Sequence, residues 1–418
     1  MERMVSLLGL ATMIGLAWLM SSHKRRFPWR IVIGGLGLQL VFALLILRTE
    51  AGRRFFDMID RVFVALLASV DDAALFVFGE SFRDHFFAFK VLPTIVFFSA
   101  FMSIFYYLGI MQAIVGVFAR IMQKTLGTSG AETLSAAANV FVGQTEAPLV
   151  IKPYVSTMTA SELNSVMVGG FATIAGGVLG AYVEMGISAK HLLSASVISA
   201  PAALLIGKVM QPEVETPKTL GTVEVEVEDS SQNVLEAVAN GTTDGLRLAL
   251  NVGAMIITFL ALIAVVNALL GWTGVQLHGL GVRLAMLEPG EAPQWSIEAI
   301  LGAMFAPLAW IMGIPWADSS KCGELLGLKM AANEFVAYGR LAEWAEAPGG
   351  RVIGERSETI MTYALCGFAN FSSIGIQLGG IGGIAPERRG ELARLGFRAM
   401  LGGTLAAFMT ACIAGILL

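Results

Sequence analysis

The chain has 418 residues, of which 56% are hydrophobic and only 14% are charged. Soluble domains carry roughly 25% charged residues, so this composition excludes an ordinary soluble protein and indicates a membrane protein. The formal net charge of −4 excludes nothing further, because the position of charges matters more than their sum in a membrane protein. Three cysteines without a pairing pattern predict free buried thiols, and four scattered histidines predict no metal site.

Uncharged runs long enough to cross about 30 Å of hydrocarbon recur along the chain. They are continuous rather than alternating, which favours transmembrane helices over a β-barrel. The fold class that we expect is therefore an all-α polytopic membrane protein. Eight transmembrane helices are predicted, at Val5–Met20, Ile31–Leu47, Val91–Phe118, Leu163–Val183, His191–Gly207, Leu248–Trp272, Thr359–Ala385 and Ala399–Leu418.

Two basic segments set the expected orientation. The loop 21–30 (SSHKRRFPWR) follows the first span, and the stretch 387–394 (ERRGELAR) precedes the last one. Basic loops stay in the cytoplasm, so we expect the N- and C-termini to lie outside. The stretch 53–80 has apolar residues at helical spacing with charges between them, which predicts an interfacial helix along the outer surface. The acidic stretch 213–233 predicts a cytoplasmic linker between two halves.

Short motifs recur in the two halves of the chain. Asn139–Gly143 (NVFVG) resembles Asn333–Ala337 (NEFVA), and Gly170–Ala172 (GFA) recurs as Gly367–Ala369. Each copy has a short, broken apolar segment, then a Gly-rich span, then an uninterrupted apolar span. On the expected topology the first copy begins at the cytoplasmic face and the second begins outside, so the repeats are inverted. Inverted repeats with broken segments at matching positions are typical of secondary transporters.

The broken segments predict two re-entrant helical hairpins. The first, Thr133–Pro153, has too few uncharged residues before Glu146 to cross the membrane. The second, 299–338, is interrupted by Pro307 and Pro315 and is charged towards its end. Non-helical backbone at membrane depth is tolerated only against protein or a water-filled cavity. We therefore expect a binding site near the midplane, where the two hairpins meet.

Each hairpin carries a carboxylate. A charge at membrane depth is costly unless it is paired or solvated, so Glu146 and Glu334 are expected to face a cavity. Glu146 follows Gln144 and Thr145, and carboxylates with amides suit a neutral ligand that is rich in hydroxyl groups. The alternative is that these side chains only join helices or pair with nearby lysines.

The Gly-rich spans 169–186 and 366–383 follow the hairpins. Glycine in mid-span permits unwinding, which exposes backbone carbonyls to a cation, although such glycines often serve close packing alone. Thr173, Asn370 and Ser373 add side-chain oxygens. Together these features favour a lining for a ligand and an ion.

With these motifs identified, the sequence resembles the concentrative nucleoside transporter family over nearly its whole length. Gly143–Leu149 (GQTEAPL) is similar to the first-hairpin motif of the family, Gly327–Tyr338 (GLKMAANEFVAY) to its signature, and Gly367–Gly375 (GFANFSSIG) to its third motif. The resemblance implies a non-enzymatic homotrimer in the lipid bilayer of the bacterial inner membrane, with nucleoside as its substrate and no nucleic acid partner. A mobile transport domain then moves like an elevator against a scaffold domain that forms the trimer contacts.

The resemblance also implies a division of the chain. Residues 1–128 hold scaffold helices and the interfacial helix, and residues 129–209 form the first inverted repeat of the transport domain. Residues 210–297 hold the acidic linker and a scaffold span, and residues 298–418 form the second inverted repeat.

Matched residue by residue, the resemblance implies three groups of site residues. Gln144, Thr145 and Glu146 would lie near the nucleobase, with Val178 and Phe368 packed against it. The remaining residues are Glu334, Asn370 and Ser373 for the ribose hydroxyls, and Asn139, Val142, Thr173 and Ile174 for Na⁺ as the coupling ion.

Alternatives stay open for the ion and for the activity. Oxygen ligands at Asn139 and Thr173 favour Na⁺, but proton-coupled members of the family exist, so H⁺ is the alternative ion. An intramembrane hydrolase that uses Glu146 and Glu334 as an acid–base pair is a rival interpretation. A channel or a nucleoside sensor is another, although a channel has no need of inverted hairpins.

Overall fold

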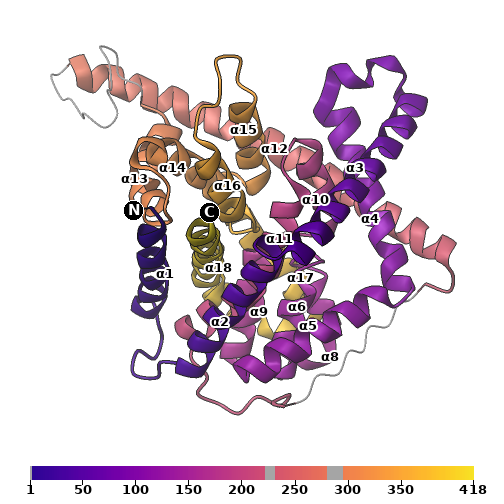
Figure 1. Ribbon diagram of the computed structural model, residues 1–418, viewed down its shortest axis with the longest axis vertical. Coiled ribbons are helices and arrows are strands. Elements are labelled where there is room, and N and C mark those ends of the chain that lie inside the picture. Colours follow the sequence, from indigo (N-terminus) through magenta and orange to yellow (C-terminus); the bar gives the residue numbers. More distant parts are fainter. Residues whose placement is uncertain (1, 222–230, 280–294) are drawn as a thin grey trace.

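The computed structural model describes residues 2–221, 231–279 and 295–418. These residues form a bundle of α-helices with no β-strand among them, as Figure 1 shows. The helices are α1 (Glu2–Leu19), α2 (Trp29–Leu47), α3 (Glu50–Phe78), α4 (Leu92–Tyr107), α5 (Ile110–Leu126), α6 (Gly130–Ala138), α7 (Ala147–Val150), α8 (Lys152–Val155), α9 (Ala160–Ala172), α10 (Gly176–Glu184), α11 (Ala189–Met210), α12 (Val234–Gly279), α13 (Ile297–Ile311), α14 (Trp316–Ala331), α15 (Glu334–Ala345), α16 (Glu355–Leu365), α17 (Phe371–Ile384) and α18 (Arg389–Leu417).

Seven segments of the described chain are long and apolar enough to cross a membrane. They correspond to seven of the eight expected spans. The eighth, Thr359–Ala385, is instead two shorter helices, α16 and α17, which an extended stretch separates. Gly367 in that stretch has a φ of 134°, a conformation that glycine adopts without strain.

The expected span Val91–Phe118 is present in its first part, but its end is wrong. α4 ends at Tyr107 and α5 begins at Ile110, because Gly109 adopts the left-handed conformation with a φ of 73°. Glycine has no Cβ, so it turns the chain here at little cost. The second part of the expected span is therefore a separate helix, α5, which is not among the seven candidate spans.

The amphipathic helix expected at 53–80 is present as α3. Phe56, Leu67, Val70 and Ala74 are buried along one of its faces. Two sets of ion pairs join the helix to its neighbours: Asp57 contacts Lys190 of α11 at 2.8 Å, while Lys90 contacts both Asp71 of α3 (3.3 Å) and Glu184 of α10 (2.6 Å). These pairs attach α3 to both sides of the α10–α11 turn.

The helix order of the first half recurs in the second, since α14–α15, α16–α17 and α18 follow one another as α6–α8, α9–α10 and α11 do. The second hairpin differs from the expectation, because Pro307 lies inside α13, which is continuous from Ile297 to Ile311. Pro315 precedes α14 at its N-cap, and the chain breaks instead at Ala332–Asn333, between α14 and α15. Proline is tolerated inside membrane helices where neighbouring groups satisfy the freed backbone. The hairpin that matches α6–α8 is therefore α14–α15.

The two interrupted spans cross each other at their breaks. The backbone N–H of Phe368, between α16 and α17, donates a hydrogen bond to the carbonyl of Thr173, between α9 and α10, at 3.3 Å. Gly367 makes this approach possible, because a Cβ there would lie only 2.9 Å from the carbonyl carbon of Ala172. The crossing brings the ends of four helices to one place in the interior.

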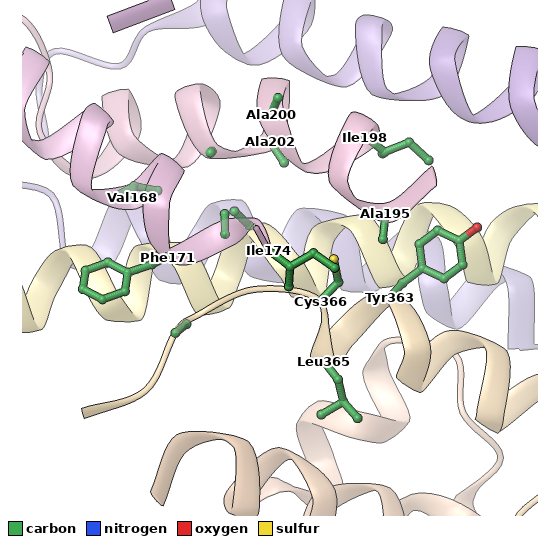
Figure 2. Packing of buried hydrophobic residues seen from close by; sticks show 14 of the residues in the cluster. Val168, Phe171, Ile174, Ala195, Ile198, Ala200, Ala202, Tyr363, Leu365 and Cys366 are labelled. Atoms are coloured by element: carbon green, nitrogen blue, oxygen red, sulfur yellow. The ribbon is translucent and has the colours of Figure 1, made fainter. Parts of the chain in front are cut away.

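On the side that faces α11, the core beside this crossing is apolar and tightly buried. Figure 2 shows Ile174 beside Cys366, where the chain leaves α16, with Ala195 and Ile198 of α11 nearby. These side chains are essentially inaccessible. All three cysteines of the chain are buried and free, as expected.

Buried ion pairs join the first helix of the first hairpin, α6, to α11 and to the segment that follows α11. Lys208 of α11 contacts Glu132 of α6 at 2.8 Å and Glu213 at 3.2 Å. The backbone carbonyl of Thr219 accepts the N–H of Gly130, the first residue of α6, at 2.8 Å. The first part of the expected acidic linker is thus packed against the hairpin; residues 222–230 of that linker lie outside the described residues.

Close packing joins α4 to α12. Gly241 and Gly245 of α12 form a G-x-x-x-G pattern, and a Cβ at either position would lie 2.8 Å from the Cα of Ala100 or Val96 of α4, respectively. Small residues at this spacing let two membrane helices approach closely.

Candidate functional site

The Glu334 carboxylate is the centre of a buried hydrogen-bond network. Glu334 is only 5% exposed and is the first residue of α15. Its Oε1 accepts a hydrogen bond from the hydroxyl of Tyr182 at 3.0 Å, and its Oε2 accepts one from the amide of Asn370 at 3.2 Å. An ionised carboxylate can accept about four hydrogen bonds, so both oxygens retain capacity for a ligand. The N-terminal position in a helix also favours a negative charge.

Asn370 joins this carboxylate to the start of α17. Its Oδ1 accepts hydrogen bonds from the backbone N–H of Ser373 (2.9 Å) and from the hydroxyl of Ser372 (2.7 Å). Its Nδ2 is the group that donates to Glu334. Because every polar atom of this amide has a partner, its orientation is fixed, and Ser373 is held within the same network.

Lys329 supplies a positive charge near Glu334 but not a salt bridge. Lys329 is 1% exposed, and its ammonium donates to the carbonyl of Ala364, in the last turn of α16, at 2.9 Å. Lys329 and Glu334 still interact electrostatically, which lowers the cost of burying either charge. The ion pair that was the alternative explanation for Glu334 is therefore not formed among the described residues.

The three polar residues in the turn of the first hairpin, Gln144, Thr145 and Glu146, have different surroundings. Gln144 is buried, and its Nε2 donates to the hydroxyl of Ser373 at 3.2 Å. Thr145 packs against α17 at Gly380, where a Cβ would lie 2.9 Å from the Thr145 methyl carbon. Glu146 is exposed, and its carboxylate accepts the backbone N–H of Gly143. The structure thus brings Gln144 to Ser373, whereas Glu146 folds back over its own turn.

The two residues expected to pack against a base lie on the interrupted spans. Val178 is 2% exposed in the first turn of α10. Phe368 is half-buried in the break before α17, and its backbone is held by Thr173. Both therefore lie within a few residues of the breaks in the two interrupted spans.

Asn139 ends α6 with an unpaired oxygen. Its side chain is 1% exposed, and its Nδ2 donates to the carbonyl of Ser135 at 3.0 Å. Within the described residues, neither Asn139 Oδ1 nor Ser135 Oγ has a hydrogen-bond partner. A buried acceptor without a partner costs about 1–3 kcal/mol, so these oxygens fit a cation that would bind them.

The other expected cation ligands lie on segments that pack near Asn139, since a Cβ at Gly169 of α9 would lie 3.3 Å from Asn139 Nδ2. Thr173 is buried at the break between α9 and α10, and its hydroxyl donates to the carbonyl of Gly169 at 3.0 Å. Val142 lies in the hairpin turn and Ile174 in the break, and the N–H of Gly176 joins the two segments by donating to the carbonyl of Phe141 at 2.9 Å. Neutral carbonyl, amide and hydroxyl oxygens beside an unwound helix are the type of site that binds Na⁺.

Sequence reasoning missed several residues of this region. Tyr182 contacts Glu334 although the two are far apart in the chain, and nothing in the sequence signals that contact. Gln377 had a readable signal, because it lies one turn after Ser373 in an otherwise apolar stretch. Its Nε2 donates to Gln144 Oε1 at 3.1 Å and to the carbonyl of Met167 at 3.1 Å.

Comparison with known families identifies the chain. Residues 191–415 match the C-terminal model of the Na⁺ dependent nucleoside transporters, and residues 8–81 match the N-terminal model of the same family. The chain belongs to the Na⁺-dependent nucleoside transporter family. Residues 88–189 also match a model described as nucleoside recognition. The family expected from the hairpin motifs is therefore confirmed.

Named relatives cover the whole chain. An "Uncharacterized transporter" of Haemophilus influenzae is 44% identical over 100% of this chain and 98% of its own length. Solute carrier family 28 member 3 of Mus musculus is 45% identical and sodium/nucleoside cotransporter 1 of Rattus norvegicus is 42% identical, each over 100% of this chain. The chain spans 59% and 64% of the length of these two animal proteins. All three are named as transporters, which confirms the expectation of a transporter rather than an enzyme.

Solved structures share the fold. The transporter CNTnw in an inward-facing substrate-bound state is 38% identical, with a TM-score of 0.89 over 100% of this chain and 98% of that one. An outward-facing variant of CNTnw is 39% identical, with a TM-score of 0.91 over 100% of this chain and 97% of that one. The expected all-α architecture of spans and hairpins is therefore confirmed.

Proposed function

We propose that this protein is a secondary active symporter that imports nucleosides together with Na⁺. The observation that carries the proposal is the Glu334 carboxylate, which is buried at the meeting of α15 and α17 and held by Tyr182 and Asn370. A carboxylate with spare acceptor capacity suits a vicinal diol, which is the group that a ribose presents. Uridine-like nucleosides, and purine nucleosides as well, are the substrates that we propose.

The proposed ligand contacts follow the geometry of the two hairpins. Glu334, Asn370 and Ser373 bind the ribose hydroxyls, because they share one hydrogen-bond network. The nucleobase lies at the turn of the first hairpin and against the two interrupted spans. Its contacts are Gln144, Thr145, Glu146, Val178 and Phe368.

The proposed Na⁺ site lies beside the first hairpin, at Asn139, Val142, Thr173 and Ile174. The unpaired, buried Asn139 Oδ1 supports this assignment. Na⁺ bound there ties α6 to the break after α9, and the same hairpin presents Gln144 to the substrate. Each ligand therefore raises the affinity for the other, which is the linkage that symport requires.

The proposed transport cycle is of the elevator type. CNTnw has been solved in inward-facing, outward-facing and intermediate states, which supports alternating access in a protein of this fold. We assign residues 129–209 and 298–418 to the mobile transport domain, and residues 1–128 and 210–297 to the scaffold domain and linker. The scaffold would form a homotrimer in the bacterial cytoplasmic membrane, with both chain termini outside.

Uptake into proteoliposomes tests this function. Purified protein is reconstituted, and accumulation of radiolabelled uridine is followed with an inward Na⁺ gradient or with choline in place of Na⁺ at matched pH. Accumulation above the external concentration only with Na⁺ is expected. Accumulation in choline that is driven by a pH gradient would assign the coupling to H⁺, and no accumulation under either gradient would refute nucleoside symport.

A further inference from the structure

We propose that the ion pair between Lys90 and Glu184 is an ionic lock, which holds the mobile domain against the scaffold in one state and has to open in every transport cycle. The inference rests on the proposed function, because it takes the two domains from the proposed elevator motion. It adds the residues that hold one end of that motion, and these residues lie outside the proposed substrate and cation sites.

Lys90 connects the two proposed domains. It lies in a short π-helix, η2 (Phe87–Val91), which directly precedes α4. Its Nζ lies 2.6 Å from Oε1 of Glu184, the last residue of α10, and 3.3 Å from Oδ2 of Asp71 in α3. Asp71 and Lys90 belong to the proposed scaffold, whereas Glu184 belongs to the proposed transport domain. The ammonium group therefore has one carboxylate partner on each side of the boundary.

The charges of this pair remain satisfied when the domains separate. Lys90 retains Asp71, which belongs to the same domain. The Glu184 side chain is only 7% exposed in the pair, but the chain reaches the surface two residues later, at the exposed Gly186. A displacement of α10 would therefore transfer the carboxylate to water. Because opening a buried ion pair is most unfavourable when it leaves a charge buried and unpaired, this arrangement lets the lock open in each cycle.

Two further contacts cross the same boundary. Lys190, near the start of α11, contacts Asp57 of α3 at 2.8 Å. The Phe87 ring, which precedes Lys90 in η2, lies edge-on to the Phe335 ring of the second hairpin, with the ring centroids 5.6 Å apart. The scaffold thus contacts both inverted repeats here. The Asp57 side chain is 54% exposed, so water and salt weaken its ion pair. The better buried pair in η2 is therefore the contact that we expect to hold the state.

A reversible cross-link distinguishes a lock from permanent packing within one rigid body. The double variant Lys90→Cys/Glu184→Cys is reconstituted and treated with a short bifunctional methanethiosulfonate, whose cross-link dithiothreitol removes. The three native cysteines are buried, so they should not react. We expect the cross-link to abolish Na⁺-driven uptake of uridine, because the domains can no longer separate, and we expect dithiothreitol to restore it.

Lys90→Cys/Asp71→Cys is the matched control, because both of its positions lie in the proposed scaffold and their side chains are also in contact. Mass spectrometry of the intact protein shows whether each cross-link has formed. Uptake by the control variant should be the same before and after cross-linking. The inference is overturned if cross-linked Lys90→Cys/Glu184→Cys protein still transports uridine, or if this pair does not cross-link while the control pair does.

A distance measurement tests whether the ion pair itself favours this state. Spin labels at Arg83 and Glu346, which are exposed residues of the scaffold and of the segment after α15, report the separation of the domains by pulsed electron paramagnetic resonance. In Glu184→Gln, the ratio of molecules at the distance of this structure to molecules at other distances should fall about fivefold. Glu50→Gln is the control, because it removes an ion pair within α3 and should leave the ratio unchanged.

The outcomes separate the lock from the proposed function. An unchanged ratio in Glu184→Gln overturns the lock, and so does a single distance in the wild-type protein under all conditions, with and without Na⁺ and uridine. If the wild-type protein accumulates no nucleoside, then the proposed symport fails. The distance measurement then still decides whether the ion pair holds one state, because it needs no transported substrate.

Discussion

Replacing Glu334 by glutamine tests the ribose site with almost no change in shape. In the wild-type protein the Glu334 carboxylate accepts a hydrogen bond from Tyr182 at one oxygen and from Asn370 at the other. In Glu334→Gln the amide oxygen must face Asn370, because the Asn370 NH₂ group can only donate. The new NH₂ group then faces Tyr182, whose hydroxyl can rotate and accept. The internal network therefore survives, and the protein should fold.

Although the fold should be retained, the affinity of Glu334→Gln for the nucleoside should fall strongly. Hydrogen bonds to charged groups contribute about 1.5–3 kcal/mol each, and a vicinal diol can donate two to the carboxylate. The amide oxygen that replaces the carboxylate in this variant would keep at most one bond of the weaker, neutral kind. We expect a loss of about 3 kcal/mol, which corresponds to binding that is roughly 100-fold weaker.

Calorimetric titration of the purified protein with uridine measures this loss directly. Titration with 2′,3′-dideoxyuridine shows whether the loss arises at the diol, because the difference in affinity between uridine and this analogue should be large in the wild type and much smaller in the variant. Glu343→Gln is the matched control, since Glu343 is an exposed residue of the same helix. The reasoning is refuted if a monodisperse Glu334→Gln protein binds uridine within threefold of the wild-type affinity.

Three further substitutions test other parts of the structure. Asn139→Ala should raise the Na⁺ concentration for half-maximal uridine uptake, and an unchanged Na⁺ dependence would mean that the cation binds elsewhere. Gly367→Ala should lower the thermal unfolding temperature, because a Cβ there would meet the facing backbone, whereas Gly375→Ala, with open space around it, should not. Lys208→Met should destabilise the fold by about 3–5 kcal/mol because it leaves Glu132 buried without its partner, and adding Glu132→Gln should restore part of that loss in the same unfolding assay.

Residue patterns that depend on local spacing predicted the fold well. Uncharged runs located seven candidate spans, and the paired NVFVG and NEFVA motifs, which indicated a repeat, begin at the turns of the two hairpins. Two local patterns misled, however. Pro307 suggests a break, although α13 runs through it, and the apolar run continues past Gly109, although α4 ends just before that glycine. A single proline or glycine has different effects in different surroundings, so tertiary contacts decide its role.

The candidate site was predictable in its residue types but not in its pairings. Glu146 and Glu334 stand out because a carboxylate in an apolar membrane segment is costly unless it is paired or solvated. The structure shows that they differ, since Glu334 is buried in a network and Glu146 is exposed and bonded to its own turn. The partners Tyr182 and Gln377 reach the site from segments that are distant in the chain, and no sequence period reports such contacts.

The length of α12 has a consequence for the membrane around the protein. The helix has 46 residues, and at about 1.5 Å per residue it is about 69 Å long, more than twice the roughly 30 Å thickness of the hydrocarbon core. Even its expected apolar stretch, Leu248–Trp272, is about 37 Å long, so α12 has to tilt or to thicken the bilayer locally. Because Gly241 and Gly245 hold α12 tightly against α4, a change in bilayer thickness should tilt both helices as one body. The acyl-chain length of the surrounding lipid should therefore influence the rate of uptake without any contact between lipid and substrate site.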